Sequence, residues 1–252
     1  MKLYAMTWPE LREVDRQRTL VLAPLGACEQ HGPHLPTFTD SLLVGRVADG
    51  VEHALPERVL RLPVMWLGAS EHHLPFGATL TANVETHITL LVELAGPLLA
   101  DGYRRLLFLN GHGGNTDTIR VALRRLQRQY PEALLSGAGY WQLADAEIAG
   151  LCEGPCKVAL HACEMETSMM LAHRPDLVRM DQAADHYEPP PEALRGLFVA
   201  RDMSQSTRNG THGYPSFASA KKGQRLIDAS VRRTTEACRE LLETPLPALP
   251  AT

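Results

Sequence analysis

Two kinds of apolar segment alternate along this chain, and the alternation limits the folds open to it. Four short apolar runs bounded by polar residues are typical of buried strands. The predicted strands are 20–26, 59–67, 105–109 and 134–141. Three longer segments repeat apolar residues at three- and four-residue steps, which predicts helices. The predicted helices are 85–100, 116–130 and 162–173. Strands that alternate with helices predict an α/β fold with a mostly parallel sheet.

The chain has 252 residues, a common size for one large α/β domain. We therefore expect a single domain over residues 1–252. Within it we expect a loop at 188–191, a C-terminal quarter that wraps the sheet edge, and a frayed tail at 245–252.

Charge and cysteine usage exclude several classes of protein. The formal net charge is −4, so the basic footprint of a nucleic-acid-binding protein is missing. No stretch reaches the ~18 apolar residues of a membrane helix, and we expect no targeting segment. Five irregularly spaced cysteines do not suit a disulfide framework, and no second pair with zinc-site spacing follows Cys152 and Cys156. We expect a cytoplasmic protein that binds a small-molecule substrate and neither nucleic acid nor membrane.

The first polar cluster follows the strand predicted at 20–26. Glu29 and His31 are two residues apart, so in an extended chain their side chains point the same way. Asp40 follows after a proline-stiffened loop. Two carboxylates and an imidazole suit a catalytic Zn, Mn or Fe(II) ion better than a structural thiolate site. The alternative is a polar turn in which Asp40 caps a helix that begins at Ser41.

The second and third clusters lie near predicted helix starts. His112 is enclosed by glycines in the loop 110–115, where a strand ends, and such a histidine is typically functional. The alternative is a glycine-rich anion-binding loop. In the third cluster, Glu166 would lie roughly 140° around a regular helix from His161. Either the helix starts after His161, or one of Glu164 and Glu166 is a ligand and the other lies on the surface. The alternative to a metal-binding role is an exposed acidic first turn, which the helix dipole favours.

Together these segments resemble the creatininase (creatinine amidohydrolase) family. The matching pieces are the E-Q-H-G-x-H-L-P…D run, the N-G-H-G-G-N loop and the H-A-x-E-x-E-T-S run. A late segment at 210–223 also looks like the C-terminal pattern of the family. The resemblance covers about residues 20–225 and implies a three-layer α/β/α fold. It also implies a centre of two divalent metal ions, zinc first with manganese or iron as alternatives, and hydrolysis of C–N bonds in small, often cyclic, amides.

The resemblance also implies roles for individual residues and a homo-oligomer, with a hexamer as the family pattern. His161 corresponds to the catalytic histidine of the family, and Asp40 to the ligand that bridges both ions. The metal ligands carried over are Glu29, His31, Asp40, His112 and, as the remaining carboxylate, Glu166. The loop 68–77 looks like the pocket-lining loop of the family, although it could instead be a solvated polar loop. The predicted substrate-binding residues are Ser70, Glu71, His73, Gly113 and Trp141.

Two departures from the family pattern bear on the substrate. In creatininase proper an aromatic residue and a metal-binding glutamate follow the loop histidine, whereas this chain has Gly113 and Gly114. Creatininase proper also has a glutamate before the catalytic histidine, where this chain has Leu160. The resemblance is therefore to the broader family, which includes formamide hydrolases, a peptide-trimming member of a cofactor pathway and a hydrolase of oxidised inositol.

We expect a metal-dependent amidohydrolase in which a metal-activated water attacks the carbonyl carbon of a small amide, cyclic amide or formamide. His161 would give a proton to the leaving nitrogen. One alternative is a hydrolase or isomerase of a cyclic, inosose-type ketose. Another is a peptide-trimming enzyme of cofactor maturation, and a third is a binding protein without turnover.

Overall fold

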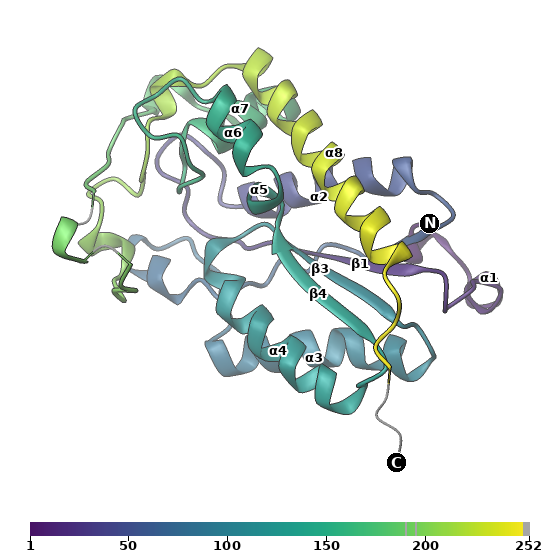
Figure 1. Cartoon of the computed structure of the whole chain (residues 1–252). Coiled ribbons are helices and arrows are strands. Elements are labelled where there is room, and N and C mark those ends of the chain that lie inside the picture. The colour runs from purple at the N-terminus through teal and green to yellow at the C-terminus, as the bar shows by residue number, and fades with distance from the viewer. Residues whose placement is uncertain (190, 195, 249–252) are drawn as a thin grey trace.

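A four-stranded parallel sheet lies at the centre of the computed structural model, which describes residues 1–189, 191–194 and 196–248 (Figure 1). The strand order is β2-β1-β3-β4. The strands are β1 (Leu20–Leu25), β2 (Val59–Arg61), β3 (Arg105–Asn110) and β4 (Leu134–Gly139). In register, Leu20 pairs with Val59 on one side and with Arg105 on the other. The predicted parallel sheet is thereby confirmed.

Helices cover both faces of the sheet, as Figure 1 shows. The helices are α1 (Trp8–Arg12), α2 (Thr39–Ala54), α3 (Val84–Ala100), α4 (Thr116–Gln129), α5 (Tyr140–Leu143), α6 (Asp145–Leu151), α7 (Glu164–His173) and α8 (Ala220–Glu243). One apolar core lies between the sheet and α3 and α4, and a second lies between the sheet and α2, α7 and α8. This arrangement confirms the three-layer α/β/α fold.

The two cores share β1 because successive side chains of a strand point to opposite faces. Leu20 and Leu22 belong to the core under α2 and α8, whereas Val21 and Ala23 belong to the core under α3 and α4. All six residues of β1 are buried. The continuous apolar run that predicted this strand therefore reflects a strand with helices on both sides.

Several predicted boundaries differ from the structure. The strand predicted at 59–67 ends at Arg61, because Pro63 has no N–H for the ladder. The chain still runs beside β1, and Met65 donates its backbone N–H to Pro24 at 3.0 Å. The strand predicted at 134–141 ends at Gly139, where α5 begins. The helix predicted at 162–173 starts at Glu164, because Ala162 has a left-handed backbone with φ of +49°.

Five helices, α1, α2, α5, α6 and α8, are not among the predicted ones, although a helix from Ser41 was left open as an alternative. The expectation that the C-terminal quarter wraps the sheet edge is wrong, because α8 packs across α2 and α7 and also contacts the central strands β1 and β3. Its N-terminus is capped by Ser219, whose side chain accepts the N–H of Lys222. Of the expected loop at 188–191 and tail at 245–252, residues 190 and 249–252 lie outside the described residues.

The connections leave β1 and β3 in opposite directions, which places a crevice between their carboxyl ends. From β1 the chain passes through α2 on one face to β2, whereas from β3 it passes through α4 on the other face to β4 at the opposite edge. In open α/β sheets, ligands bind at such a switch point, outside the carboxyl ends of the strands. Within the described ranges, none of the helices combines the length and apolarity needed to cross a bilayer. All five cysteines are free.

Candidate metal centre

The polar side chains of the three sequence clusters meet at this crevice. Glu29 and His31 follow β1, and Asp40 lies in the first turn of α2. His112 follows β3, and Glu166 lies in the first turn of α7. All five predicted metal ligands are buried.

Close packing of β3 against α2 brings His112 to Asp40. A Cβ atom on Gly111 would lie 2.7 Å from the Cβ of Val44 and 2.9 Å from the carbonyl oxygen of Asp40. Such distances are not sterically tolerated, so the chain requires glycine there. The alternative that Asp40 caps a helix from Ser41 is wrong, because α2 begins at Thr39 and no side chain caps its N-terminus.

The first group of candidate ligands consists of Glu29, Asp40 and His112. His112 Nε2 lies 3.2 Å from the carbonyl oxygen of Ala69, which can only accept a hydrogen bond. The neutral imidazole therefore carries its proton on Nε2 and a lone pair on Nδ1. That Nδ1 atom lies 3.2 Å from both Glu29 Oε1 and Asp40 Oδ2. A lone pair that faces two carboxylate oxygens is unfavourable unless a positive charge, either a second proton on the ring or a metal ion, lies between them.

The second group consists of His31, Asp40 and Glu166 and repeats the pattern. His31 Nδ1 lies 3.2 Å from the backbone carbonyl oxygen of Glu29, so the neutral ring carries its lone pair on Nε2. This Nε2 atom lies 3.0 Å from Asp40 Oδ1 and 3.8 Å from Glu166 Oε1. Histidines that bind metals characteristically donate their outer N–H to a backbone carbonyl in this way.

Asp40 is common to both groups and gives one oxygen to each. Oδ1 faces His31 and Oδ2 faces His112. Ligand atoms at 2.0–2.2 Å from one ion lie about 3.0–3.5 Å apart. The three contacts of 3.0–3.2 Å that join Asp40 and Glu29 to these imidazoles match that spacing.

Unpaired carboxylate oxygens give an independent test of metal binding. Both oxygens of Glu29, Oδ2 of Asp40 and Oε2 of Glu166 are buried without a hydrogen bond among the described residues. A buried ionised carboxylate is costly unless it is paired or coordinates a metal. Imidazole nitrogens and carboxylate oxygens suit Zn, Mn and Fe(II). The residues present therefore fit two divalent cations that share Asp40.

The electrostatics of the cluster reflect the same lack of positive charge. Burial raises the pKa of Glu29. Although burial opposes a charge on His112, the neighbouring Glu29 and Asp40 raise its pKa to about 10. Burial alone would also raise the pKa of Asp40, but His31 and His112 hold it well below its usual range. The cluster therefore stabilises positive charge at the nitrogens that face the carboxylates.

His161 lies beside these ligands on the open side of the cluster. Its Nε2 donates to the backbone carbonyl oxygen of Gln30 at 2.8 Å, which leaves the lone pair on Nδ1. Nδ1 lies 3.6 Å from Glu29 Oε1. The His161 side chain is 15% exposed, whereas that of His31 is fully buried. Burial and the neighbouring rings of His31 and His73 lower the pKa of His161.

Gln30 links His161 to His73. Its Oε1 accepts the backbone N–H of Gly32 at 2.9 Å, which identifies its other side-chain atom as the NH₂ group. That group donates to His73 Nδ1 at 2.9 Å. His73 must then carry its proton on Nε2, which lies 3.2 Å from Glu29 Oε1. Gln30 thus sets the tautomer in which the Nε2–H of His73 faces Glu29, and no sequence pattern predicted this role.

Replacing Gln30 by methionine should reduce metal affinity or turnover about 10–100-fold, the usual effect of removing a group that orients a ligand. Methionine has a similar length but cannot donate to His73. Metal titration followed by amide hydrolysis would measure the effect. Gln224→Met on the exposed face of α8 is a matched control. Equal metal affinity and equal turnover of the two variants would show that Gln30 does not position His73.

The two glutamates of the third cluster have different environments. Glu164 Oε1 and Oε2 accept the backbone N–H groups of Glu153 and Gly154, both at 2.8 Å, and Glu164 forms a buried ion pair with Lys222. Glu166 instead joins the ligand cluster. Because α7 starts after His161, the geometric conflict expected of a regular helix does not arise.

The variants Glu164→Gln and Glu166→Gln should therefore fail in different ways. Glu164→Gln removes the buried carboxylate from Lys222, which keeps Glu153 Oε2 at 3.0 Å as its other partner, and should cost about 1–3 kcal/mol of unfolding free energy while metal content is retained. Glu166→Gln should lose metal with a much smaller change in stability. Urea unfolding and metal analysis of both variants would show the contrast, and a reversed pattern would assign the ligand role to Glu164.

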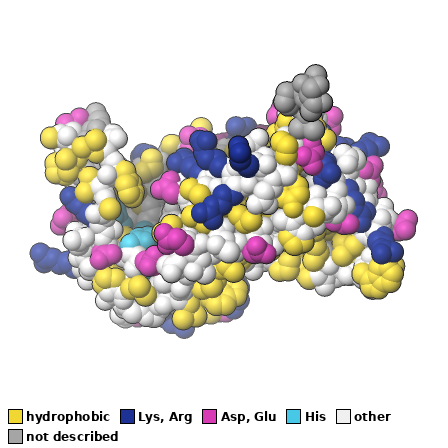
Figure 2. Space-filling view, turned by 90° about the horizontal axis from the view of Figure 1, so that it is seen from below, with side chains coloured by type: hydrophobic (Ala, Val, Ile, Leu, Met, Phe, Trp, Pro, Cys, Tyr) yellow, Lys and Arg dark blue, Asp and Glu magenta, His cyan; other side chains and the backbone are white. Residues whose placement is uncertain are grey.

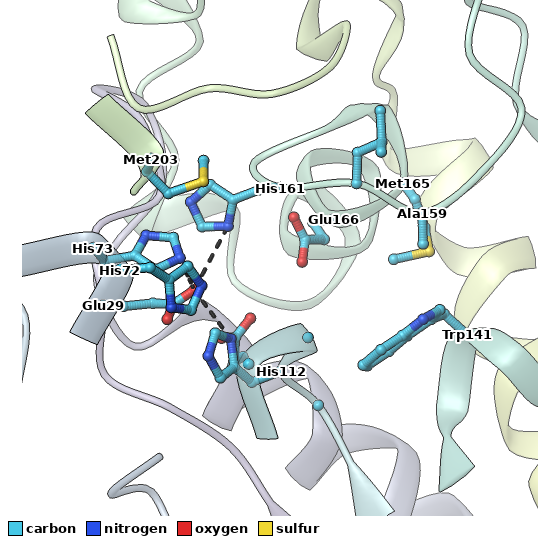
Figure 3. A pocket seen from close by; sticks show the side chains of 15 residues that line it. Glu29, His72, His73, His112, Trp141, Ala159, His161, Met165, Glu166 and Met203 are labelled. Carbon is cyan, nitrogen blue, oxygen red and sulfur yellow. Dashed lines mark ion pairs between the residues drawn. The ribbon is translucent and has the colours of Figure 1, made fainter. Parts of the chain in front are cut away.

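The predicted substrate-binding residues do not all line one cavity. A pocket of about 230 Å³ opens above the cluster and is lined by His73, Gly113 and Trp141 among others (Figure 3). Ser70 is buried outside this lining, with its Oγ 3.2 Å from His112 Nε2. Glu71 is exposed and lines a neighbouring hollow.

Other pocket residues were not predicted. His72 stacks on the His112 ring with centroids 5.7 Å apart, and Met165 and Met203 add apolar surface. The doubled histidine at 72–73 was the available signal for His72. No sequence pattern marks Met203, which comes from a segment far along the chain.

Comparisons with known proteins agree with this geometry. The family model described as "Creatininase: Creatinine amidohydrolase" matches residues 4–238. A mycofactocin precursor peptide peptidase of Mycobacterium ulcerans is 31% identical over 228 residues, which cover 88% of this chain and 81% of that protein. A 3-dehydro-scyllo-inosose hydrolase of Thermotoga maritima is 32% identical over 187 residues, which cover 71% of this chain and 58% of that protein.

Solved structures with the same fold include metal-containing forms. A manganese form of creatininase has a TM-score of 0.80 with 27% identity and covers 96% of this chain and 99% of its own. A mutant creatininase of Zn–Zn type has a TM-score of 0.79 with 26% identity and covers 96% of this chain and 98% of its own. These similar proteins are hydrolases by name, and they differ in substrate.

Proposed function

The chain belongs to the creatininase family, and on this premise we propose that it is a metal-dependent hydrolase of a C–N bond in a small molecule. The main support is the position of Asp40. Each of its two carboxylate oxygens faces an imidazole nitrogen that holds a lone pair. We propose Glu29, Asp40 and His112 as ligands of one ion, and His31, Asp40 and Glu166 as ligands of the other, with zinc first and manganese or iron as alternatives. Two divalent cations bound there would supply a water of lowered pKa and polarise a carbonyl oxygen.

We assign proton transfer to His161. Because its Nε2–H is engaged with the Gln30 carbonyl, only Nδ1 can exchange a proton with the pocket. When water adds to the carbonyl carbon, Nδ1 can take the proton that water loses and give it to the leaving nitrogen as the C–N bond breaks. The left-handed backbone at Ala162 turns the chain between His161 and α7 and so helps to fix the ring at the pocket wall.

The pocket supports a small amide, cyclic amide or formamide as the group that reacts. Its volume of about 230 Å³ is below the usual range for drug-sized ligands. Trp141 and Met165 provide apolar contact near Glu166, and Figure 3 shows the face of the Trp141 ring turned toward the cavity. We keep Glu71, His73, Gly113 and Trp141 as proposed substrate-binding residues, whereas Ser70, whose Oγ lies 3.2 Å from His112 Nε2, would position His112 instead.

Trimming of a peptide end is the second candidate. The similarity to the mycofactocin precursor peptide peptidase favours it, as does the absence of side chains at Gly113 and Gly114 on the pocket edge. A panel that contains formamides, cyclic amides and short peptides with free ends would separate the two candidates.

Metal content and hydrolysis test the proposal together. We expect the purified or reconstituted protein to hold at least one equivalent of Zn, Mn or Fe per chain and to hydrolyse a member of the panel. Activity should disappear with a chelator and return with metal. A protein that stays below a tenth of an equivalent after reconstitution, or a metal-loaded protein inert toward the whole panel, would contradict it.

We also propose a homo-oligomer. Its support is the exposed apolar residues Trp8 and Leu197, which are 67% and 66% exposed. Light scattering after gel filtration would show one species of several chains, and a monomer at micromolar concentration would contradict this assignment.

A further inference from the structure

A second hollow adjoins the pocket above the metal centre. It has a volume of about 620 Å³, and its lining shares His72, Gly113 and Gly114 with the pocket. Figure 2 shows histidine side chains at the floor of a depression with acidic side chains beside it. The segment that contributes Met203 to the pocket contributes Arg201 and neighbouring residues to the hollow. The pocket and the hollow therefore lie on either side of the residues that they share, and we call Gly113 and Gly114 the edge between them.

Two of the three residues that line both spaces, Gly113 and Gly114, have no side chain, and the third, His72, stacks on the His112 ring. A Cβ atom on Gly113 would meet nothing within 4 Å, so the space above it is open. At Gly114 a Cβ atom would collide with the carbonyl oxygen of Ala69 and with His112, so no side chain can stand there. A bound molecule can pass over these two residues without displacing a side chain.

The chemistry of the hollow differs from that of the pocket. Val84, Phe198 and Val199 provide apolar surface, and all three are exposed to solvent by more than 40%. The charged residues of its lining are Glu71, Asp117, Asp202 and Arg201. Asp117 also pairs with Arg120 at 3.4 Å, but Glu71 and Asp202 against Arg201 still give the lining a negative balance, which favours a cationic group and disfavours an anionic one.

We propose that the substrates are elongated, with the C–N bond at the metal centre and a tail that crosses the Gly113–Gly114 edge into this hollow. The tail has an apolar stem and a neutral or positively charged end. This inference rests on the proposed function, because the metal centre fixes where the reacting bond lies. It makes Gly113 a specificity-determining position and assigns the second hollow as a binding site for the distal part of the substrate.

Hydroxamates that differ only in their tails test the inference. The hydroxamate head group binds metal ions in hydrolases, so differences in affinity report on where the tail binds. Calorimetry on the metal-loaded protein would compare acetohydroxamate, 6-aminohexanohydroxamate and the monohydroxamate of adipic acid. We expect the amino-ended probe to bind at least about tenfold more tightly than acetohydroxamate, because its methylenes are buried. The carboxylate-ended probe should gain much less.

Gly113→Trp should close the edge and remove the advantage of the amino-ended probe over acetohydroxamate. Gly113→Leu repeats the test if the tryptophan variant folds poorly. Gly150→Trp, at an exposed helical glycine that also has nothing within 4 Å of its Cβ position, is the matched control and should keep the wild-type ratio. Asp117→Asn should reduce the preference for the amino-ended tail over the carboxylate-ended one.

The outcomes separate this inference from the proposed function. Equal affinities of the three hydroxamates for the wild type would overturn the second binding site without affecting the metal centre. The same would follow if both Gly113 variants kept the wild-type ratio of affinities between the amino-ended probe and acetohydroxamate. Failure of every hydroxamate to bind the metal-loaded protein would count against the proposed function and the inference together.

Discussion

Replacing Asp40 by asparagine should remove at least one metal ion and reduce hydrolysis by about 10³-fold or more, the size of effect seen when an electrostatic element of a site is lost. The reason is that each oxygen of Asp40 faces a different imidazole. Asparagine has the same size, but it presents an NH₂ group to one of the two sites and loses the charge that balances both cations.

Metal analysis and kinetics on the purified variant would measure this effect. Asp228→Asn, an exposed position on α8, controls for the loss of one carboxylate elsewhere. Helix α2 should remain folded, because no side-chain cap is lost. Near-normal metal content together with near-normal turnover in Asp40→Asn would contradict the bridging role.

Replacing His161 by alanine should lower turnover about 10²–10⁴-fold, the usual contribution of a positioned proton donor or acceptor, while metal content is retained. The retention follows from geometry, since His161 Nδ1 is 3.6 Å from Glu29 Oε1 and its ring lies on the open side of the cluster. Added imidazole should restore part of the activity by replacing the lost ring.

Metal analysis of His161→Ala also decides a competing role. Glu29, His31 and His161 form a third group whose candidate ligand atoms lie within 4.8 Å of one another. If the variant loses a metal ion along with its activity, His161 is a ligand, and its assignment to proton transfer is wrong.

The sequence predicts the sheet, and the polar residues that gather at its crevice, more completely than it predicts the surrounding helices. The run at 20–26 is apolar because β1 is covered on both faces. Such a run predicts a buried strand whatever the packing details of the helices around it. Helix α2 was considered only as an alternative that begins at Ser41, because Asp40 in its first turn was interpreted as part of a polar motif. The boundary of α7 depends on the left-handed backbone of Ala162, which alanine does not signal in sequence.

The choice between Glu164 and Glu166 required the structure. Both lie in the first turn of α7, and only the buried Lys222, 58 residues further along the chain, shows that Glu164 is already paired. Gln30 illustrates the same limit. Its role depends on hydrogen bonds to Gly32, His73 and the carbonyl of Gly210, which spacing along the chain does not reveal.

The most direct test is a crystal of the manganese-loaded protein, measured for anomalous scattering. We expect two peaks, one bounded by Glu29, Asp40 and His112 and the other by His31, Asp40 and Glu166, with Asp40 between them. A single peak, or peaks that Asp40 does not join, would contradict it.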